Sequence, residues 1–470
     1  MLFNSFQFLL FFPVVCFVYY LLPHKFRWFF LLLASYYFYM NWQPIYALLI
    51  LFSTLLTYGC GILVEKYKGD RKRQKIYLVF SLILNFGILF IFKYYNFINE
   101  SVFTLLNYLG IRWAVPNFDI LLPVGISFYT FQAVGYSIDV YRGAIKAEKN
   151  LGIYALFVSF FPQLVAGPIE RAKNLLGQFR AVHTFSYSNA SQGLKLMLWG
   201  YFMKLCVADR LGLYVDAVFN NVPQHGGITF LLASVFFAFQ IYCDFGGYSL
   251  IAIGAAKVMG FDLMENFRRP YFSKNVKEFW SRWHISLSTW FKDYVYIPLG
   301  GNRVGPDRHM LNLFITFIVS GIWHGANWTF VLWGGIHGCY QIIAILKNRY
   351  IPRFNGYKPL KDIANIFITF SLVVFGWIFF RANQVSDAFE IIKTIGTNPG
   401  HLFIDNSVLG LGVLSLIILL VKEVIDEYDL KFKWLGTRYG IIRLAVVISL
   451  IVYIMLVGVF DGGQFIYFQF

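Results

Sequence analysis

Two histidines stand in aromatic surroundings where an imidazole could do chemistry. His324 lies in SGIWHGANW (320–328), between two tryptophans and beside two glycines, with apolar residues before and after. His284 lies in FWSRWHISLSTWF (279–291). A neutral imidazole keeps one acceptor nitrogen, so it can act as a general base. The alternative for His324 is a buried histidine that donates to a carbonyl and stabilises helix packing.

The neighbours of each histidine are candidates for orienting a base or a substrate. Trp323 precedes His324, and Asn327 would lie one turn away if the helix continues. Gly321 and Gly325 would let another backbone or a substrate approach. Around His284 the candidates share the same short segment, and they are Arg282, Trp283 and Ser286.

The sequence does not favour a metal site. His284, His324 and His337 show no HxxxH or HxxE spacing. We expect the other histidines, in loops or at helix ends, to be ordinary ones. The five cysteines (Cys16, Cys60, Cys206, Cys243 and Cys339) are scattered through apolar surroundings without a CxxC pair. They are expected to be small buried hydrophobic residues.

The elements that must position these residues are membrane helices. Of the 470 residues, 58% are hydrophobic and 14% are charged, and runs of about twenty apolar residues recur. We predict an all-α multi-pass membrane protein with one domain, 1–470, and a catalytic core at about 120–346. The predicted spans are 3–22, 27–40, 45–64, 76–95, 121–140, 151–166, 193–208, 229–259, 310–323, 328–346, 363–380, 408–422 and 441–460. We expect two or three of these to be re-entrant or to lie in the membrane plane rather than to cross.

The charge pattern predicts the orientation of the chain. The net charge is +16, and EKYKGDRKRQK (65–75) carries six of the Lys and Arg residues. The positive-inside rule places 65–75 in the cytoplasm and the N-terminus outside. The first apolar segment lacks a basic start and a cleavage site, so we expect it to be retained rather than removed as a signal peptide.

One region is too polar to span and too aromatic for a simple loop. Residues 262–309 contain eight Lys and Arg residues after position 267, interleaved with aromatic side chains. Amphipathic helices at the cytoplasmic interface fit this composition. A helix rising from this region would lift His324 about 22 Å above His309. That is deep in a hydrocarbon core of about 30 Å, where ionisable groups are functional candidates.

Two further polar positions interrupt apolar spans. Pro162, Gly167 and Pro168 break the helix in FFPQLVAGPIERAKNLLGQF (160–179), and Gln163 flanks the break. The break indicates a cavity lining; a helix-ending loop is the alternative. Asp244 lies in the apolar FQIYCDFGGYS. It needs a partner there, either structural or in the active cavity.

Long contiguous motifs make this chain resemble a known family. FFPQLVAGPIERAKNLLGQF, IYCDFGGYSLIAIGAAKVMGFDLMENFRRPY, EFWSRWHISLSTWFKDYVYIPLGGNR and SGIWHGANWTFVLWGGIHG resemble the membrane-bound O-acyltransferases, most closely their bacterial alginate and peptidoglycan O-acetyltransferase branch. The resemblance covers essentially the whole chain. It implies a ring of tilted helices around a thin partition, where funnels from both sides meet near His324.

The resemblance also implies a reaction. His324 corresponds to the family's membrane histidine, and His284 to its second polar catalytic residue. The donor would be cytoplasmic acetyl-CoA, a substrate, with no cofactor and no metal. The basic 268–308 surface would attract its phosphates. Nucleic acid is not an expected partner, and the setting would be a bacterial inner membrane.

The last residues, FIYFQF (465–470), remain apolar and aromatic. An interfacial anchor is the plain interpretation. The alternative is that Tyr467 accepts the acyl group from outside, because a phenol of pKa near 10 gives an activated ester. Related systems resemble this arrangement, and a secreted serine-esterase-like partner then completes transfer to a polysaccharide.

Other functions stay open on the sequence. A transporter or flippase shares broken helices and buried polar groups, but transporters usually carry internal repeats and none is apparent. A D-alanyl group from a carrier protein would keep the chemistry and change the donor.

Overall fold

The computed structural model describes residues 1–113, 115–118, 122–165, 167–350, 358–430, 440–460 and 466. All regular elements among these residues are helical, which confirms the all-α prediction. Seven helical stretches within this described part are long and apolar enough to cross a membrane. They are Pro44–Lys66, Arg71–Tyr108, Gly227–Val258, Trp328–Tyr350, Pro359–Arg381, Val408–Glu427 and Gly440–Val457.

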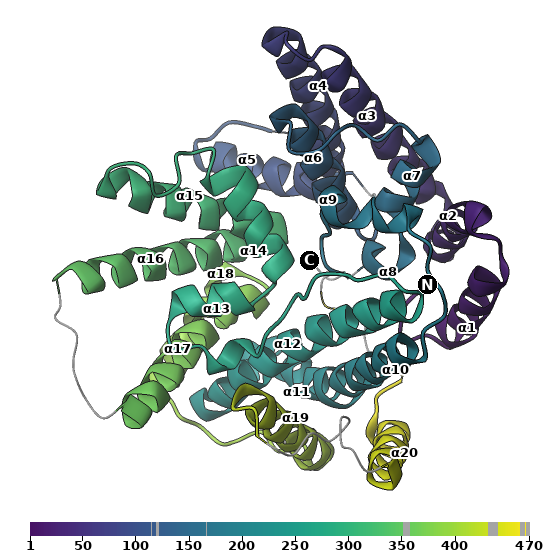
Figure 1. Ribbon diagram of the computed structural model, residues 1–470. Helices are drawn as coiled ribbons and strands as arrows, with labels where there is room; N and C mark the ends of the chain where they lie inside the picture. The colour runs from purple at the N-terminus through teal and green to yellow at the C-terminus, as the bar shows by residue number, and fades with distance from the viewer. Residues whose placement is uncertain are drawn as a thin grey trace. The chain divides into compact units, whose positions relative to one another are not determined.

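The chain forms two compact units, which are described separately here. The first contains Met1–Leu194 and Ala252–Met264. Its helices are α1 (Phe6–Leu21), α2 (His24–Met40), α3 (Ala47–Lys66), α4 (Arg71–Leu89), α5 (Tyr95–Tyr108), α6 (Ile126–Arg142), α7 (Leu151–Ser159), α8 (Phe161–Leu164), α9 (Ala172–Leu175) and the beginning of α10 (Tyr187–Tyr201). Within it α3, α4 and α6 pack side by side (Figure 1).

The second unit contains Lys195–Ile251 and Glu265–Phe470 and carries both candidate histidines. Its helices are the end of α10, α11 (Asp209–Phe219), most of α12 (Gly227–Val258), α13 (Val276–Arg282), α14 (Ile285–Phe291), α15 (Pro306–His324), α16 (Trp328–Tyr350), α17 (Lys358–Arg381), α18 (Val385–Thr397), α19 (Val413–Glu427) and α20 (Gly440–Val457). Figure 1 shows α15 and α16 running side by side, with α17 against α16.

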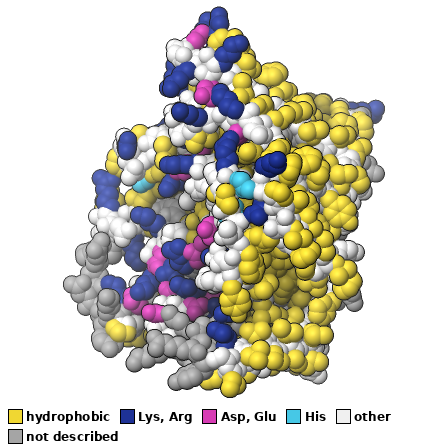
Figure 2. All heavy atoms as spheres, turned by 45° about the vertical axis from the view of Figure 1, so that its right-hand side comes forward, with side chains coloured by type: hydrophobic (Ala, Val, Ile, Leu, Met, Phe, Trp, Pro, Cys, Tyr) yellow, Lys and Arg dark blue, Asp and Glu magenta, His cyan; other side chains and the backbone are white. Residues whose placement is uncertain are grey.

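The surface has the apolar character that a lipid environment requires. Large hydrophobic side chains are exposed along several of the helices, for example Phe17, Ile83, Phe367 and Met455. Figure 2 shows a broad area of hydrophobic side chains, while Lys, Arg, Asp and Glu gather elsewhere on the same view. Such a surface is stable in hydrocarbon and would aggregate in water. The chain is a multi-pass membrane protein.

Each predicted span overlaps a helix, but four helices were not predicted. They are α5, α9, α11 and α18. Helix α9 has only four residues. The sequence of α5 contains three asparagines and a glutamate, yet it follows α4 through the π-helical Phe90–Tyr94 as one stretch. Helices α11 and α18 carry charged residues on one face. A search for uninterrupted apolar runs therefore passed over all of them.

The predicted helix break at Pro162 is confirmed. Helix α7 ends at Ser159, and the four-residue α8 begins at Phe161. The freed backbone groups find partners within the first unit. The Phe161 N–H donates to Ser35 Oγ at 3.1 Å, and Gln163 Nε2 donates to the Phe157 carbonyl at 2.7 Å. A cavity lined by this break stays a prediction.

The aromatic, basic region contains helices too short to cross a membrane, as expected. Helices α13 and α14 have seven residues each, and a π-helical turn, Lys292–Tyr296, follows. The helix after them, α15, runs unbroken from Pro306 to His324, so the predicted rise between His309 and His324 stands. The interfacial position of α13 and α14 stays a prediction.

The cysteines form no disulfide. Cys60, Cys206 and Cys243 are buried, as expected, and Cys16 is half-buried. The prediction was wrong for Cys339, which is exposed on α16. Helix α16 is largely apolar, so the sequence around Cys339 does not show whether the cysteine faces other helices or the outside of the protein.

Glycines set the distance between α15 and α16. A Cβ atom added to Gly321 would lie 2.3 Å from the Phe330 carbonyl oxygen and 3.2 Å from Gly334 Cα. One added to Gly334 would lie 2.4 Å from the Phe317 carbonyl oxygen. The two helices therefore approach through backbone contacts that only glycine allows. The prediction that Gly321 admits another backbone is confirmed.

The substitution Gly321→Ala should separate α15 from α16 and lower stability by about 1–3 kcal/mol, the usual cost of overpacking. Gly335→Ala is the matched control on α16, because its Cβ would meet only Ile318 Cδ1 at 3.6 Å. The measurement is the thermal unfolding midpoint in detergent. Equal midpoints for the two variants would contradict this account of the contact.

Candidate active site

His324 is the last residue of α15, and aromatic rings surround it. Its ring centroid lies 5.0 Å from that of Trp323, 5.0 Å from Trp333 and 5.3 Å from Phe380. Only 3% of its surface is exposed. The helix ends because Gly325 is extended and leaves no space for a side chain: a Cβ there would lie 2.1 Å from the Phe330 ring. An apolar cage therefore holds the imidazole at a helix end.

The helix does not continue to Asn327, so the predicted one-turn spacing from His324 is wrong. Asn327 instead precedes α16, where its Oδ1 accepts from the Thr329 N–H at 3.0 Å. Its Nδ2 donates to the Asn383 carbonyl at 3.0 Å. Gly325 is the physical reason, because its extended backbone ends the helical hydrogen-bond ladder. Asn327 thus caps the next helix.

His284 lies in the turn between α13 and α14 and is fully buried. Its backbone has a φ of 42°, a left-handed conformation that costs energy for a side chain of this size. Phe245 lies edge-on to the ring at 4.5 Å between centroids. The Trp323 ring lies 6.3 Å from the His284 ring and 5.0 Å from the His324 ring. Trp323 therefore brings the two predicted histidines into one aromatic neighbourhood.

Asn266 determines the tautomer of His284. The Asn266 Oδ1 accepts from the Ser286 backbone N–H at 3.3 Å and from Ser286 Oγ at 2.9 Å. A backbone N–H can only donate, so the atom facing it is the amide oxygen. His284 Nδ1 lies 3.1 Å from the same oxygen and must carry the proton. The acceptor nitrogen of the neutral ring is consequently Nε2.

A second contact holds Asn266 in this orientation. Its Nδ2 donates to Ser249 Oγ on α12 at 3.0 Å. Backbone hydrogen bonds then join the non-helical segment around Asn266 to the His284 turn: the Ile285 N–H donates to the Asn266 carbonyl at 2.9 Å, and the Arg268 N–H donates to the Arg282 carbonyl at 2.8 Å. Asn266 and Ser249 were not predicted. No local pattern in the sequence marks either residue as part of the site. Asn266 lies 18 positions before His284, the histidine that it contacts, and Ser249 contacts Asn266 only after the chain has folded.

Burial also sets the protonation of His284. It lowers the pKa of this histidine from 6.5 to about 3, because the charged form of the ring loses its hydration when it is buried. The ring is therefore neutral at ordinary pH. Such a ring is a weak base and a good hydrogen-bond acceptor through Nε2.

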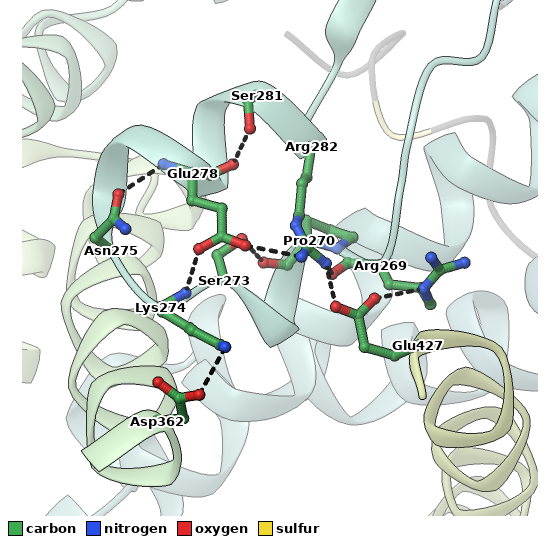
Figure 3. Close-up of polar contacts among 10 residues, drawn as sticks. All are labelled: Arg269, Pro270, Ser273, Lys274, Asn275, Glu278, Ser281, Arg282, Asp362 and Glu427. Atoms are coloured by element: carbon green, nitrogen blue, oxygen red, sulfur yellow. Dashed lines mark hydrogen bonds and ion pairs between the residues drawn. The ribbon is translucent and has the colours of Figure 1, made fainter. Parts of the chain in front are cut away.

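Ion pairs fasten the segment that carries His284 (Figure 3). Glu427, at the end of α19, accepts from Arg269 Nε at 2.7 Å and from Arg282 Nη1 at 2.8 Å. Arg282 Nη2 also donates to Glu278 at 2.7 Å, within α13. Lys274 reaches Asp362 on α17 at 2.8 Å. These contacts tie two neighbouring helices to the residues beside the histidine.

The predicted substrate residue Arg282 is thus engaged in the protein itself. Its neighbour Trp283 is buried, with its ring 5.5 Å from Phe279 and 5.1 Å from Trp377 between centroids. Ser286 lies within 3.4 Å of His284 Nδ1 through its hydroxyl. Of Arg282, Trp283 and Ser286, the last is therefore the one whose side chain is placed to influence the His284 ring by a polar contact.

Asp244 has partners in the second unit, away from the histidine contacts described above. Its Oδ1 lies 2.6 Å from Lys204 Nζ, and its Oδ2 accepts from the Ile466 backbone N–H at 2.7 Å. Lys204 also pairs with Asp209 at 2.7 Å. The expectation that Asp244 needs a partner is confirmed. Its charged partner is the buried Lys204, which the sequence did not reveal.

The remaining predicted residues fall outside this cluster or outside the description. Gln163 belongs to the first unit, where it donates to a carbonyl as described above. Tyr467 lies outside the described residues. His337 is buried on α16, and the Trp333 ring contacts both its ring and that of His324, at 4.9 Å and 5.0 Å. Within the described part of the chain, no three His, Cys, Asp or Glu side chains could hold a metal together.

Comparison with known proteins places these residues in a named family. Residues 149–381 match the model of the membrane-bound O-acyltransferase family. The chain is 40% identical to the probable alginate O-acetylase AlgI of Pseudomonas aeruginosa over 397 residues, which cover 84% of this chain and 75% of the relative. It is 32% identical to the peptidoglycan O-acetyltransferase of Helicobacter pylori, covering 78% of this chain and 73% of the relative.

A more distant relative carries a different acyl group in its name. The teichoic acid D-alanyltransferase of Streptococcus thermophilus is 29% identical over 340 residues, which cover 67% of this chain and 78% of the relative. The family match contains both histidines, Asn266 and the ion-paired segment. The chain belongs to the membrane-bound O-acyltransferase family, in its alginate and peptidoglycan O-acetyltransferase branch, and is an acyltransferase.

Proposed function

We propose that this protein moves an acetyl group from cytoplasmic acetyl-CoA across the membrane for O-acetylation of an extracellular or periplasmic polysaccharide. The observation that carries the proposal is the pair of buried histidines, His284 and His324, which share the Trp323 ring inside the family match. The names of the relatives at 40% and 32% identity support an acetyl group, and alginate or peptidoglycan as the type of polymer.

His324 is the proposed base. It takes the proton from an attacking hydroxyl, the hydroxyl oxygen bonds to the thioester carbonyl carbon, and the carbon–sulfur bond breaks. The imidazolium then returns the proton to the leaving thiolate. An ester and a free thiol result. The aromatic cage around His324 supports this role, because it excludes water that would otherwise hydrolyse the thioester.

His284 is proposed as the partner of this base. Its pKa of about 3 makes it unsuited to removing a proton, and its neutral Nε2 suits it to accept a hydrogen bond that orients the substrate. Ser286 and Asn266 hold the ring in that state. Trp323, Trp283, Asn327, Arg282, Asp244 and Gln163 stay proposed as residues that shape the site or its surroundings.

Tyr467 is the proposed first acceptor, from which a secreted serine-esterase-like partner would take the acetyl group to the polymer. A phenol loses its proton more readily than an alcohol, so its ester stays activated for a second transfer. The donor would approach from the cytoplasmic side of a bacterial inner membrane, with the N-terminus outside, as the charge pattern predicts.

A D-alanyl group is the second candidate. It is favoured by the D-alanyltransferase relatives at 29% and 28% identity. The two donors can be compared directly by supplying the purified protein with acetyl-CoA or with a D-alanyl thioester of a carrier protein. The proposal expects consumption of acetyl-CoA.

The substitution His324→Ala should reduce acetyl transfer by about 10²–10⁴-fold, the usual worth of a general base. The measurement is thiol release from acetyl-CoA, together with polymer acetylation in cells. His309→Ala, at the other end of α15, is the control and should keep both activities. The proposal fails if the His324 variant unfolds no earlier than the parent protein and still transfers acetyl.

Asn266→Asp should give the reaction a new acidic limb. The added carboxylate favours the protonated ring, so the pKa of His284 rises from about 3 toward its ordinary 6.5. Activity then falls as the pH drops through the raised value, whereas the parent protein shows no such loss from His284 above pH about 4. Ser249→Ala loosens Asn266 without adding charge, so it should lower the rate at every pH. A parental profile in Asn266→Asp would exclude the assigned contact.

Tyr467→Phe should abolish covalent acetyl on the protein and acetylation of the polymer. Mass spectrometry of the intact protein after incubation with acetyl-CoA reports the first, and ester analysis of the polymer reports the second. The matched control is Tyr453→Phe on α20. It also removes one tyrosine hydroxyl, which forms a 2.8 Å hydrogen bond with Ser415 Oγ. Normal polymer acetylation in Tyr467→Phe would rule out this acceptor.

A further inference from the structure

A buried ionic cluster lies in the second unit, and its groups carry out no step of the proposed reaction. Lys204 comes from the π-helical segment η4 (Phe202–Ala208), Asp209 begins α11, and Asp244 lies in the middle of α12. The Lys204 ammonium lies 2.7 Å from Asp209 and 2.6 Å from Asp244. Their side chains are 1%, 7% and 4% exposed, respectively. Such a cluster is costly to bury, so each of its groups needs a partner.

The cluster has more acceptor oxygens than its one ammonium group can bind. Two carboxylates face one ammonium, which leaves acceptor capacity for an N–H or O–H donor. One donor is present: the Ile466 backbone N–H donates to Asp244 Oδ2 at 2.7 Å, across 222 residues of sequence. The other carboxylate has capacity left, because Asp209 Oδ2 is buried and accepts no hydrogen bond from any residue that the structure describes.

The same elements also hold the end of α20 and the chain just after it, at one point each. The Val459 N–H donates to the Leu205 carbonyl at 3.1 Å. Arg210 Nη2 donates to the Val457 carbonyl. Leu205 lies in η4, whose wider turns shift carbonyls out of the ordinary helical ladder. Contacts at 457, 459 and 466 therefore converge on one surface, made of η4, the start of α11 and Asp244.

All three contacts use the backbone of the segment. Recognition through N–H and carbonyl groups fixes which residue lies opposite the cluster, whatever the side chains are. The Ile466 side chain is also buried, at 3% exposure. A slip of one residue would take the Ile466 N–H away from Asp244 and expose or misplace this side chain. The Asp244 contact thus holds Ile466, the residue before Tyr467 in the sequence.

We propose that Lys204, Asp209 and Asp244 form a receptor for the backbone at Ile466, and that this contact is needed for Tyr467, the next residue in the sequence, to accept the acyl group. This rests on the proposed function for the role of Tyr467. Lys204, Asp209 and Asp244 are positioning residues, because they act through the backbone of Ile466 and not on the reacting atoms.

The direct test removes the Ile466 N–H. Ile466→Pro lacks the donor, and Ile466→Val keeps it with a similar side chain. The full-length protein in detergent is digested with carboxypeptidase, and the remaining C-terminus is read by mass spectrometry. We expect Ile466→Val to stay protected like the parent, and Ile466→Pro to be trimmed at least ten times faster. Equal protection in the two variants would overturn the receptor.

A second variant changes the receptor and leaves the segment intact. Asp244→Asn leaves Lys204 and Asp209 as a balanced pair, so folding is threatened less than by loss of Lys204. The bond to Ile466 loses its charge in one orientation of the amide and is lost in the other, so trimming should again be faster than in the parent. An unchanged trimming rate would remove Asp244 from the receptor.

The catalytic readouts separate positioning from folding. In Ile466→Pro and Asp244→Asn, covalent acetyl on Tyr467 should fall at least tenfold. In Ile466→Pro, slow hydrolysis of acetyl-CoA by water and the thermal midpoint should stay near the parental values. If acetyl-CoA hydrolysis is lost and the thermal midpoint falls as well, the cluster only supports the fold. His324→Ala should lose hydrolysis as well, and if it does not, the proposed function fails independently of the receptor.

Discussion

The Asn266 amide oxygen accepts hydrogen bonds from a backbone N–H, a hydroxyl and an imidazole, and the geometry of the His284 turn depends on this convergence. The backbone N–H of Ser286 decides the orientation of the amide, and the amide decides which ring nitrogen of His284 carries the proton. A left-handed residue without such support would relax to an ordinary conformation. The polar contacts of a few buried atoms therefore determine the chemistry that His284 can offer.

The two histidines differ in what surrounds them. Aromatic rings enclose His324, while His284 has an amide and a hydroxyl on one side and aromatic rings on the other. A ring fixed by polar contacts keeps one tautomer, which suits an acceptor that orients a substrate. Trp323 touches both rings, so a change in either histidine is expected to affect the other.

Sequence reasoning reached the helices and both histidines because their signals are local. Apolar runs indicate the spans, and an ionisable residue within an apolar stretch stands out directly in the sequence. It failed where the answer depended on contacts distant in sequence. Asn266 and Ser249 look like ordinary polar residues, and Lys204 lies in an apolar segment whose acidic partner is Asp244, forty positions later. The spacing expected for Asn327 failed for another reason, because an extended Gly325 ends the helix.

The basic segment also has a more specific character than its composition indicates. Five of its eight cations are paired with acids: Arg268, Arg269, Lys274, Arg282 and Lys292. Lys277, Arg303 and Arg308 are exposed and form no ion pair with the described residues. The paired arginines hold Glu427 and Glu278 around the turn before His284, so they contribute rigidity where the composition suggested attraction. Lys204 has a similar structural role, because it holds Asp209 and Asp244 together in apolar surroundings. The carboxyl oxygens that Lys204 leaves available can accept from another group, as Asp244 does from the Ile466 N–H.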